Sequence, residues 1–302
     1  MTRVATIPNQ RILFGAIGKS QQKLAETQIQ MATGKKAQDF ASLGVEAVRN
    51  LSARTLVARQ EAHGAVAKRL NTTLAIVDAN LGGAEESLTK VRNDILKTVG
   101  TGQSTGLQEA IEEAFQRFRY AMNADEGGLP LFAGSQTNQP PFQPASLADT
   151  IGLSTADAFT NDNVKAAARV ADGLNVEYGI VADEIGARFF EAFRTIAEAG
   201  TIDNQPTAAQ LDALNDAVAL LDEGLKTLRT VNGENGRRRA QIETLETRAE
   251  ERTLLLKELI SENEDADLSQ VASELVQRRT TLEASYQTFA RLSGLSLVNF
   301  LR

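Results

Sequence analysis

The side chains that could do chemistry in this chain are few. Its 302 residues include one histidine, His63, and neither cysteine nor tryptophan. Thiol nucleophiles, disulfides and zinc–thiolate sites are therefore excluded, and a Ser–His–Asp triad would depend on His63 alone. Because no Ser or Asp near the segment RQEAHGAVAKR forms a recognisable nucleophile motif, we interpret His63 as a surface or helix-packing residue.

Three other segments have the composition of binding sites. The glycines of GTGQSTG (100–106) are spaced as in a phosphate-binding loop, but no Lys is present and a helical pattern precedes them, which favours a helix–helix turn. The acidic run ENEDAD (262–267) lacks the central Gly of a calcium loop and indicates a flexible joint with a helix N-cap. The run RRR (237–239) is expected on a solvated or salt-bridged helix face. We therefore predict no catalytic residue, no metal site and no cofactor: the chain is not expected to be an enzyme.

Charge and hydropathy exclude further classes of protein. The net charge of −7 argues against a nucleic-acid partner, although residues 1–60 carry nine Lys/Arg against three Asp/Glu. That basic stretch is expected to meet the acidic stretch 240–267, within or between subunits. No apolar run approaches the roughly 18–20 residues of a membrane span, so no membrane insertion is expected. The first 15 residues do not read as a cleaved secretory signal.

Proline placement predicts the architecture. Four of the six prolines fall within 130–144, and the spans 9–129 and 207–302 contain none. Since proline inside a helix costs about 3 kcal/mol, these two spans are where long helices can form. The predicted fold class is mainly α, with long heptad helices from both termini forming a coiled-coil or helical-bundle rod. A small α+β outer domain is inserted in the middle.

Apolar residues at heptad spacing support the long helices. One unbroken seam predicts a coiled-coil helix in the first half of the chain. Two more, 211–228 and 242–259, share a register if polar residues fill the layers between them, which favours one helix of roughly 55 residues through NGENG (232–236). The first seam consists of Leu70, Leu74, Val77, Leu81, Ala84, Leu88, Val91 and Ile95.

The two ends of the chain have thinner apolar stripes. A single helix with such a stripe cannot bury it alone, so each end needs a partner, either the other end or another molecule. We expect these residues to be the assembly surface and to be ordered on assembly. The packing residues are Leu13, Ile17, Leu24 and Met31 near the start, and Leu275, Leu282, Tyr286, Phe289, Leu292, Leu295, Leu297 and Phe300 near the end.

The middle of the chain has a different pattern. The segments 164–170 and 175–182 resemble a β-hairpin with Asp172-Gly173 at its turn, and a short helix is predicted over 183–199. Three capping boxes mark helix starts. They begin at Thr105, Thr207 and Asp267, each with Gln three residues later.

Three segments resemble one family, the bacterial flagellin-like axial proteins, and within it the hook–filament junction group. QIQMATGKKAQDF (28–40) is similar to the family's N-terminal signature, and YQTFARLSGLSLVNFLR (286–302) to its terminal helix. LPLFAGSQTNQPPF (129–142) resembles the entry to the outer domain of the junction group. After the Lys pair this chain has DFASLG where the family usually has two Asp. The residues that match the motifs are Ala32, Thr33, Gly34, Lys35, Leu131, Phe132, Gly134, Ser135, Thr137, Pro140, Pro141 and Phe142.

The resemblance implies that the chain is divided into three domains. Residues 1–38 with 267–302 would form a terminal coiled-coil domain, 39–129 with 205–266 a long helical-bundle domain, and 130–204 the outer domain. The implied function is a structural adaptor that joins hook to filament.

The resemblance also implies export and partners. The chain would leave the cell through the flagellar export apparatus, without a cleaved signal and with a chaperone, and act in the extracellular flagellum. Its partners would be like subunits in a ring, a neighbouring hook-associated protein and flagellin. Two alternatives stay open: flagellin itself, the filament subunit, and a cytoplasmic helical scaffold.

Overall fold

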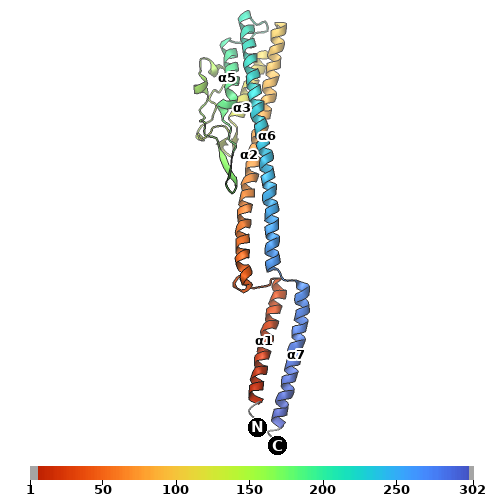
Figure 1. Ribbon diagram of the computed structural model, residues 1–302. Helices are drawn as coiled ribbons and strands as arrows, with labels where there is room; N and C mark the ends of the chain where they lie inside the picture. The colour runs from red at the N-terminus through yellow and green to blue at the C-terminus, as the bar shows by residue number, and fades with distance from the viewer. Residues whose placement is uncertain (1–5, 299–302) are drawn as a thin grey trace. The chain divides into compact units, whose positions relative to one another are not determined.

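The computed structural model describes residues 6–298, with side chains from residue 11 to residue 291. The fold is mainly α-helical with two small hairpins in its middle, as predicted (Figure 1). No helix within residues 6–298 is long and apolar enough to cross a membrane. The elements are α1 (Thr6–Thr33), η1 (Ala41–Leu43), α2 (Val45–Thr101), α3 (Leu107–Met122), β1 (Asp125–Glu126), β2 (Leu129–Pro130), η2 (Leu147–Thr150), α4 (Thr155–Ala158), β3 (Ala167–Ala171), β4 (Leu174–Glu177), α5 (Ala182–Glu198), α6 (Ala208–Glu264) and α7 (Leu268–Val298).

Contacts group the chain into two compact units. One consists of residues 1–59 and 252–302 in their described parts, and the other of residues 60–251. The first contains α1, α7 and the adjoining ends of α2 and α6. The three-part division expected from the sequence stays a prediction.

The seam of α2 forms the spine of the second unit. All eight of its residues are buried, and Leu74, Leu81, Leu88 and Ile95 have no exposed surface. They pack with the apolar face of α6, which runs beside α2 (Figure 1). Burying a Leu or Ile side chain contributes roughly 1.5–3 kcal/mol, so this row of side chains is a main source of the unit's stability.

The helix α6 is continuous through the segment NGENG, as its heptad register predicted. Polar residues do fill the layers between the two apolar seams. Asn235 has no exposed surface and donates its side-chain amide to the carbonyl oxygen of Leu74 (Nδ2···O 3.0 Å). Arg239 pairs with Asp78 of α2 (Nη1···Oδ2 2.9 Å). The two helices are thus joined by polar contacts where the apolar seam is interrupted.

Aromatic side chains fix the inserted segments onto the spine. Phe115 and Phe118 of α3 lie edge-on to Phe193 and Phe189 of α5, with ring centroids 5.3 and 5.7 Å apart. All four rings are buried. Gly224 of α6 permits the close approach of Phe189, since a Cβ there would lie 2.6 Å from its ring.

The predicted hairpin is present but shorter than expected. β3 pairs with β4 in antiparallel register, and the turn contains Asp172 and Gly173. Its inward residues Val170 and Val176 pack against Leu70 of α2 and Ile242 of α6. A hairpin of this size is marginal alone, and the two helices bury the face that it cannot bury itself.

Two of the three predicted helix starts hold in the structure. Thr207 and Gln210 form the reciprocal cap, with Thr207 N–H donating to Gln210 Oε1 at 3.0 Å. Asp267 accepts from the amides of the first turn of α7. The box at Thr105 is wrong: Gly106, with φ of 71°, is the N-cap of α3, and Gln108 Oε1 accepts from the backbone of Ile202.

Candidate assembly site

The family motif at the end of α1 ends the helix in a tight turn. Ala32 and Thr33 lie in the last turn of α1, and Gly34 follows with a φ of 68°, a left-handed conformation that glycine adopts without strain. Gly34 N–H donates to the carbonyl oxygen of Gln30 at 2.8 Å. The motif is therefore a helix C-cap, and its geometry explains the glycine.

The segment after Gly34 pairs with the segment that joins α6 to α7. Lys36 N–H donates to the carbonyl oxygen of Glu264 at 2.7 Å, and Ala266 N–H donates to that of Gly34 at 2.8 Å. Lys35 and Asp265 form the antiparallel bridge between these two bonds. Two segments about 230 residues apart in sequence are thus joined by their backbones.

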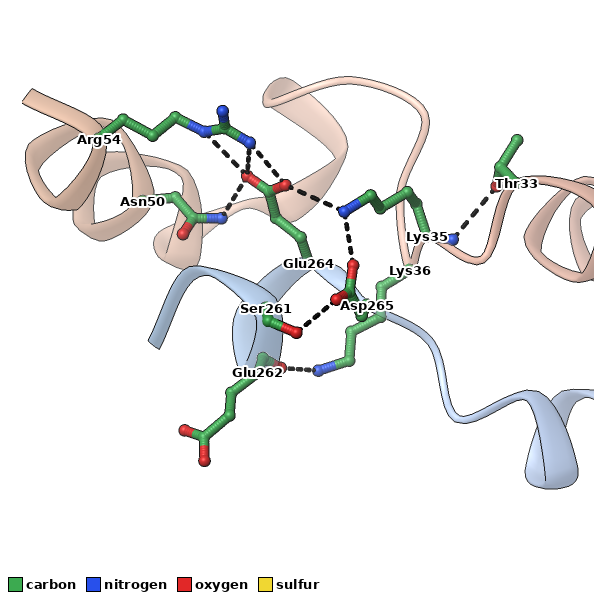
Figure 2. A network of polar contacts seen from close by, with 9 residues as sticks. All are labelled: Thr33, Lys35, Lys36, Asn50, Arg54, Ser261, Glu262, Glu264 and Asp265. Carbon is green, nitrogen blue, oxygen red and sulfur yellow. Dashed lines mark hydrogen bonds and ion pairs between the residues drawn. The ribbon is translucent and has the colours of Figure 1, made fainter. Parts of the chain in front are cut away.

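The carboxylate of Glu264 is the centre of the surrounding polar network (Figure 2). It accepts from Asn50 Nδ2 at 3.0 Å and from Arg54 Nη2 at 2.7 Å on both oxygens. Lys35 Nζ lies 3.5 Å from Oε2. The Glu264 side chain is only 9% exposed, and a buried carboxylate is tolerated because cations and donors surround it. One side chain therefore joins α6, α2 and the motif after α1.

Lys35 connects the network to its exposed rim. Its ammonium group donates to Asp265, and this hydrogen bond raises the pKa of Lys35. The same bond, together with one from Ser261, lowers the pKa of Asp265. Lys36 donates to the backbone oxygen of Glu262, so the Glu262 carboxylate itself takes no part (Figure 2).

These contacts confirm that the basic N-terminal stretch meets the acidic run 262–267, and they place the meeting within one chain. Two of the carboxylates in this run form ion pairs with lysine and arginine side chains. Among the residues that the structure describes, no group of His, Cys, Asp and Glu could hold a metal ion.

The helices α1 and α7 lie side by side (Figure 1). Phe14 packs edge-on against Phe289, with ring centroids 4.6 Å apart. Arg278 Nη1 donates to the carbonyl oxygen of Lys23 at 2.8 Å, and Gln21 donates to the hydroxyl of Tyr286. The two ends of the chain are therefore partners of each other, one of the two possibilities that the sequence left open.

This pairing covers the predicted stripes only in part. Ile17 is buried, whereas Met31 and Tyr286 are 42% and 44% exposed. Leu13, Leu24, Leu275, Leu282 and Phe289 are half-buried. Leu292, Leu295 and Leu297 lie outside the described side chains, and Phe300 lies outside the described residues.

Large apolar side chains of the first unit remain on its surface. They occur on α1, on α7 and on the first turns of α2, where Val45 is 92% exposed. Clustered exposed apolar residues are typical of surfaces that another molecule covers. The side chains are Ile12, Phe14, Val45, Val48, Leu51, Leu268 and Val276.

The second family motif, residues 131–142, is a loop anchored at both ends. Phe132 and Phe142 are buried in the aromatic core, with Pro141 buried and Leu131 half-buried beside them, while Thr137 and Pro140 are exposed. The buried side chains hold both ends of the loop, and its middle faces solvent.

A polar clamp holds the turn of this loop. Gly134, with φ of 66°, lies against Asp162, and Ser135 donates both its amide (2.9 Å) and its hydroxyl to the Asp162 carboxylate. These bonds, the hydroxyl first, lower the pKa of Asp162 to about 2. Asn123 adds two bonds to the backbone of Phe142, each 2.9 Å long.

The other residues that the sequence offered as candidate binding or catalytic sites have structural roles. His63 on α2 is 14% exposed in its side chain and lies under the hairpin turn, with Nε2 3.5 Å from Asp172 Oδ1, so it is a packing residue as expected. Arg237 and Arg238 pair with Glu234 on their own helix. Of the segment 100–106, the first two residues end α2 and residues 102–106 form the turn between α2 and α3.

Sequence reasoning missed the side chains that complete these clusters. Asn50, Arg54 and Asp162 belong to no motif, and their partners lie far away in the sequence. Asn50 is fully buried near the start of α2, but no local pattern in the sequence marks it.

No protein-family model matches the chain. Solved structures define the class of fold. A structure assigned as a flagellar hook-associated protein from Vibrio parahaemolyticus aligns with a TM-score of 0.63 at 18% identity, covering 72% of this chain and 97% of that one. The crystal structure of Bacillus cereus FlgL aligns with a TM-score of 0.55 at 16% identity, covering 70% and 98%. The fold is thus that of flagellar hook-associated proteins.

Within this class, the sequence is similar to one particular protein, flagellar hook-associated protein 3. The chain is 27% identical over 204 residues to that protein from Salmonella typhimurium, and 27% identical over 199 residues to that from Escherichia coli K12. It spans 62% and 61% of the lengths of these curated relatives. The resemblance to the junction group is confirmed, and these relatives carry the name of a flagellar component rather than of an enzyme.

Proposed function

We propose that this chain is a structural adaptor of the bacterial flagellum that joins hook to filament. The observation that carries the proposal is the first unit, in which paired terminal helices keep large apolar side chains uncovered. The similarity to flagellar hook-associated protein 3 supports the same reading. The adaptor works by packing alone, and no catalytic step is assigned to it.

The uncovered side chains of α1 and α7 contact neighbouring subunits in this proposal. Like subunits form a ring, with a second hook-associated protein on one side and flagellin on the other. Packing of a few exposed Ile, Val and Phe side chains contributes roughly 25 cal/mol per Å² of buried apolar surface, which favours assembly over the free chain. Residues 1–35 and 268–302 gain their full order on assembly, since folding and binding are coupled there.

Export follows from the same proposal. The chain leaves the cell through the flagellar export apparatus with a chaperone bound, and it acts in the extracellular flagellum. Long helices joined by short turns, without any disulfide, are compatible with passage as an unfolded chain. Hydrogen exchange of the dilute chain tests the coupling of order to assembly: strong protection of both ends in the monomer would contradict it.

The decisive experiment is deletion of the gene, followed by inspection of cells and medium. Bare hooks on the cells, with unassembled flagellin in the medium, are the expected result. Loss of the flagellin band itself would instead identify the chain as the filament subunit, and normal filaments would overturn both readings.

Deletion of residues 290–302 is the matched experiment on the surface itself. The truncated chain keeps the whole spine of α2 and α6, so it is expected to fold and yet fail to assemble. Filaments that still grow on the truncated protein would show that the end of α7 is not the contact.

A further inference from the structure

Two ion pairs enclose a short stretch of the α2–α6 helix pair. Arg229 Nε of α6 lies 2.6 Å from Glu85 Oε1 of α2. Further along, Arg239 Nη1 lies 2.9 Å from Asp78 Oδ2. The higher number on one helix pairs with the lower number on the other, so the helices run antiparallel. Residues 78–85 and 229–239 therefore lie beside each other and form the middle level of the pair.

Four glycines lie within the middle level, two on each helix. They are Gly82 and Gly83 of α2, and Gly233 and Gly236 of α6. None of them has a positive φ, and a Cβ added to any of them would meet nothing within 4 Å, so neither the backbone nor the packing requires glycine there. Glycine inside a helix weakens it relative to alanine, because its backbone loses more freedom on folding. Both helices are therefore weakened at the same level.

The apolar core is also interrupted at the middle level. On one side, Val77 and Val231 belong to the cluster that contains the aromatic rings of α3 and α5. On the other side, Leu74 and Ile242 belong to a separate cluster, which includes the inward residues of the β3–β4 hairpin. Between Val231 and Ile242, the buried residue of α6 is the polar Asn235. The pair thus contains two packed cores with a polar layer between them.

This polar layer is incompletely hydrogen-bonded. Asn232 Oδ1, Asn235 Oδ1 and Arg239 Nε are buried, and no described residue supplies a hydrogen-bond partner for any of these three atoms. Buried polar atoms without partners lower stability, and water can bond to them once the helices move slightly apart. A small separation of the helices is therefore less costly here than within either apolar cluster.

We propose that the middle level is a hinge, at which the α2–α6 pair bends while the apolar cluster on each side moves as one packed body. Sharp bends in helices occur where glycine or a polar insertion weakens the backbone ladder, and hinges are formed by a few such residues. The bond from Asn235 Nδ2 to the Leu74 carbonyl oxygen keeps the register of the two helices during the motion. The hinge is a property of the free chain, whatever molecule the chain assembles with.

The test is a distance measurement on the full chain by double electron–electron resonance between two nitroxide labels. The labels are attached through Ala219→Cys and Thr247→Cys, two exposed positions of α6 on opposite sides of the middle level. The chain has no cysteine of its own, so only these two positions are labelled. On a straight helix they are roughly 42 Å apart. A broad or two-peaked distribution of distances is expected, because bent and straight forms are both populated.

Replacement of all four glycines of the middle level by alanine is the decisive variant. The open space at each position lets the added methyl groups fit without a clash, so the variant is expected to fold and to give one narrow distance. Gly64→Ala is the matched control: Gly64 also lies inside α2 but outside the middle level, and its Cβ would make an ordinary contact of 3.8 Å with Ala249. This control is expected to keep the broad distribution of the unaltered chain.

Three results of the distance measurement would overturn the hinge. They are a distribution in the unaltered chain as narrow as that of the four-alanine variant, a four-alanine variant that stays broad, and narrowing by Gly64→Ala to the same extent.

Hydrogen exchange provides a second readout of the same hinge. The amides of residues 232–237 are expected to exchange faster than those of the flanking turns 221–225 and 245–249, and about tenfold more slowly in the four-alanine variant than in the unaltered chain. Uniform protection from residue 221 to residue 249 in the unaltered chain would also overturn the proposal.

Discussion

Asn235 of α6 donates its side-chain amide to the backbone oxygen of Leu74 on α2, with both residues completely buried. The amide thus lies inside a seam that is otherwise apolar, and its own Oδ1 has no hydrogen-bond partner. A buried amide in a heptad seam typically fixes the register of two helices at a cost in stability.

Replacement of Asn235 by Leu is therefore expected to stabilise the chain. Leu has the same branched skeleton without an unsatisfied oxygen, and the Leu74 carbonyl lies inside α2, where it has its helical partner. The expected gain is about 1–2 kcal/mol in the free energy of unfolding, measured by urea denaturation. Asn215→Leu on the exposed face of α6 is the control and should change little. A loss of stability in Asn235→Leu would show that the amide stabilises the helix pair outright.

The helices themselves could be predicted because their signal is local and periodic. Each seam residue of α2 repeats after three or four positions, and burial followed that repeat without exception. The register across NGENG predicted one continuous α6, and the register outweighed two glycines. The short hairpin was also predictable, since Asp172-Gly173 marks its turn.

The polar clusters could not be predicted, because their members are joined by tertiary contacts alone. Glu264 meets Asn50 and Arg54 across more than 200 residues, and no spacing rule connects them. The capping box at Thr105 was wrong for a related reason. There a tertiary contact with Ile202 takes the Gln108 side chain that a local cap would use.

The close approach of Gly134 to Asp162 predicts a sharp effect of one methyl group. A Cβ at position 134 would lie 2.2 Å from Asp162 Oδ1, and φ is also positive there. Gly152 has a similar φ of 69° but open space around it, so Gly152→Ala measures the conformational cost alone, about 1–2 kcal/mol. Gly134→Ala is expected to exceed that cost by about 1–3 kcal/mol in urea denaturation. Equal losses in the two variants would mean that the loop shifts freely away from Asp162.

The same clamp predicts that the stability of the fold depends on pH. The pKa of Asp162 is about 2 in the folded chain, below its ordinary value of 3.8. The ionised carboxylate therefore stabilises the fold above pH 3.8, and this contribution is lost as the pH falls toward 2. Ser135→Ala removes the hydroxyl bond and is expected to raise the pKa of Asp162 part of the way to 3.8, because the amides of Ser135 and Val164 still donate. NMR titration of the carboxyl carbon measures it, and an unchanged pKa would contradict the dominant role of the hydroxyl.

The network around Glu264 predicts which amides depend on one carboxylate. Glu264→Gln keeps the shape of the side chain but removes the charge that faces Arg54 and Lys35. Hydrogen bonds to charged groups contribute about 1.5–3 kcal/mol to stability. Because the two cations are half exposed, Glu264→Gln is expected to lower the free energy of unfolding by an amount at the lower end of that range.

Hydrogen exchange locates this loss. The amides of Lys36 and Ala266 close the backbone bridge beside Glu264, and both should exchange faster in Glu264→Gln. Glu262→Gln is the matched control, because Glu262 contributes only its backbone oxygen to the network and its carboxylate is free to be neutralised without breaking a bond drawn in Figure 2. Faster exchange in both variants would indicate a general effect of negative charge in the run 262–267. Faster exchange in Glu264→Gln alone would establish that one buried carboxylate holds the end of α1 to the joint between α6 and α7.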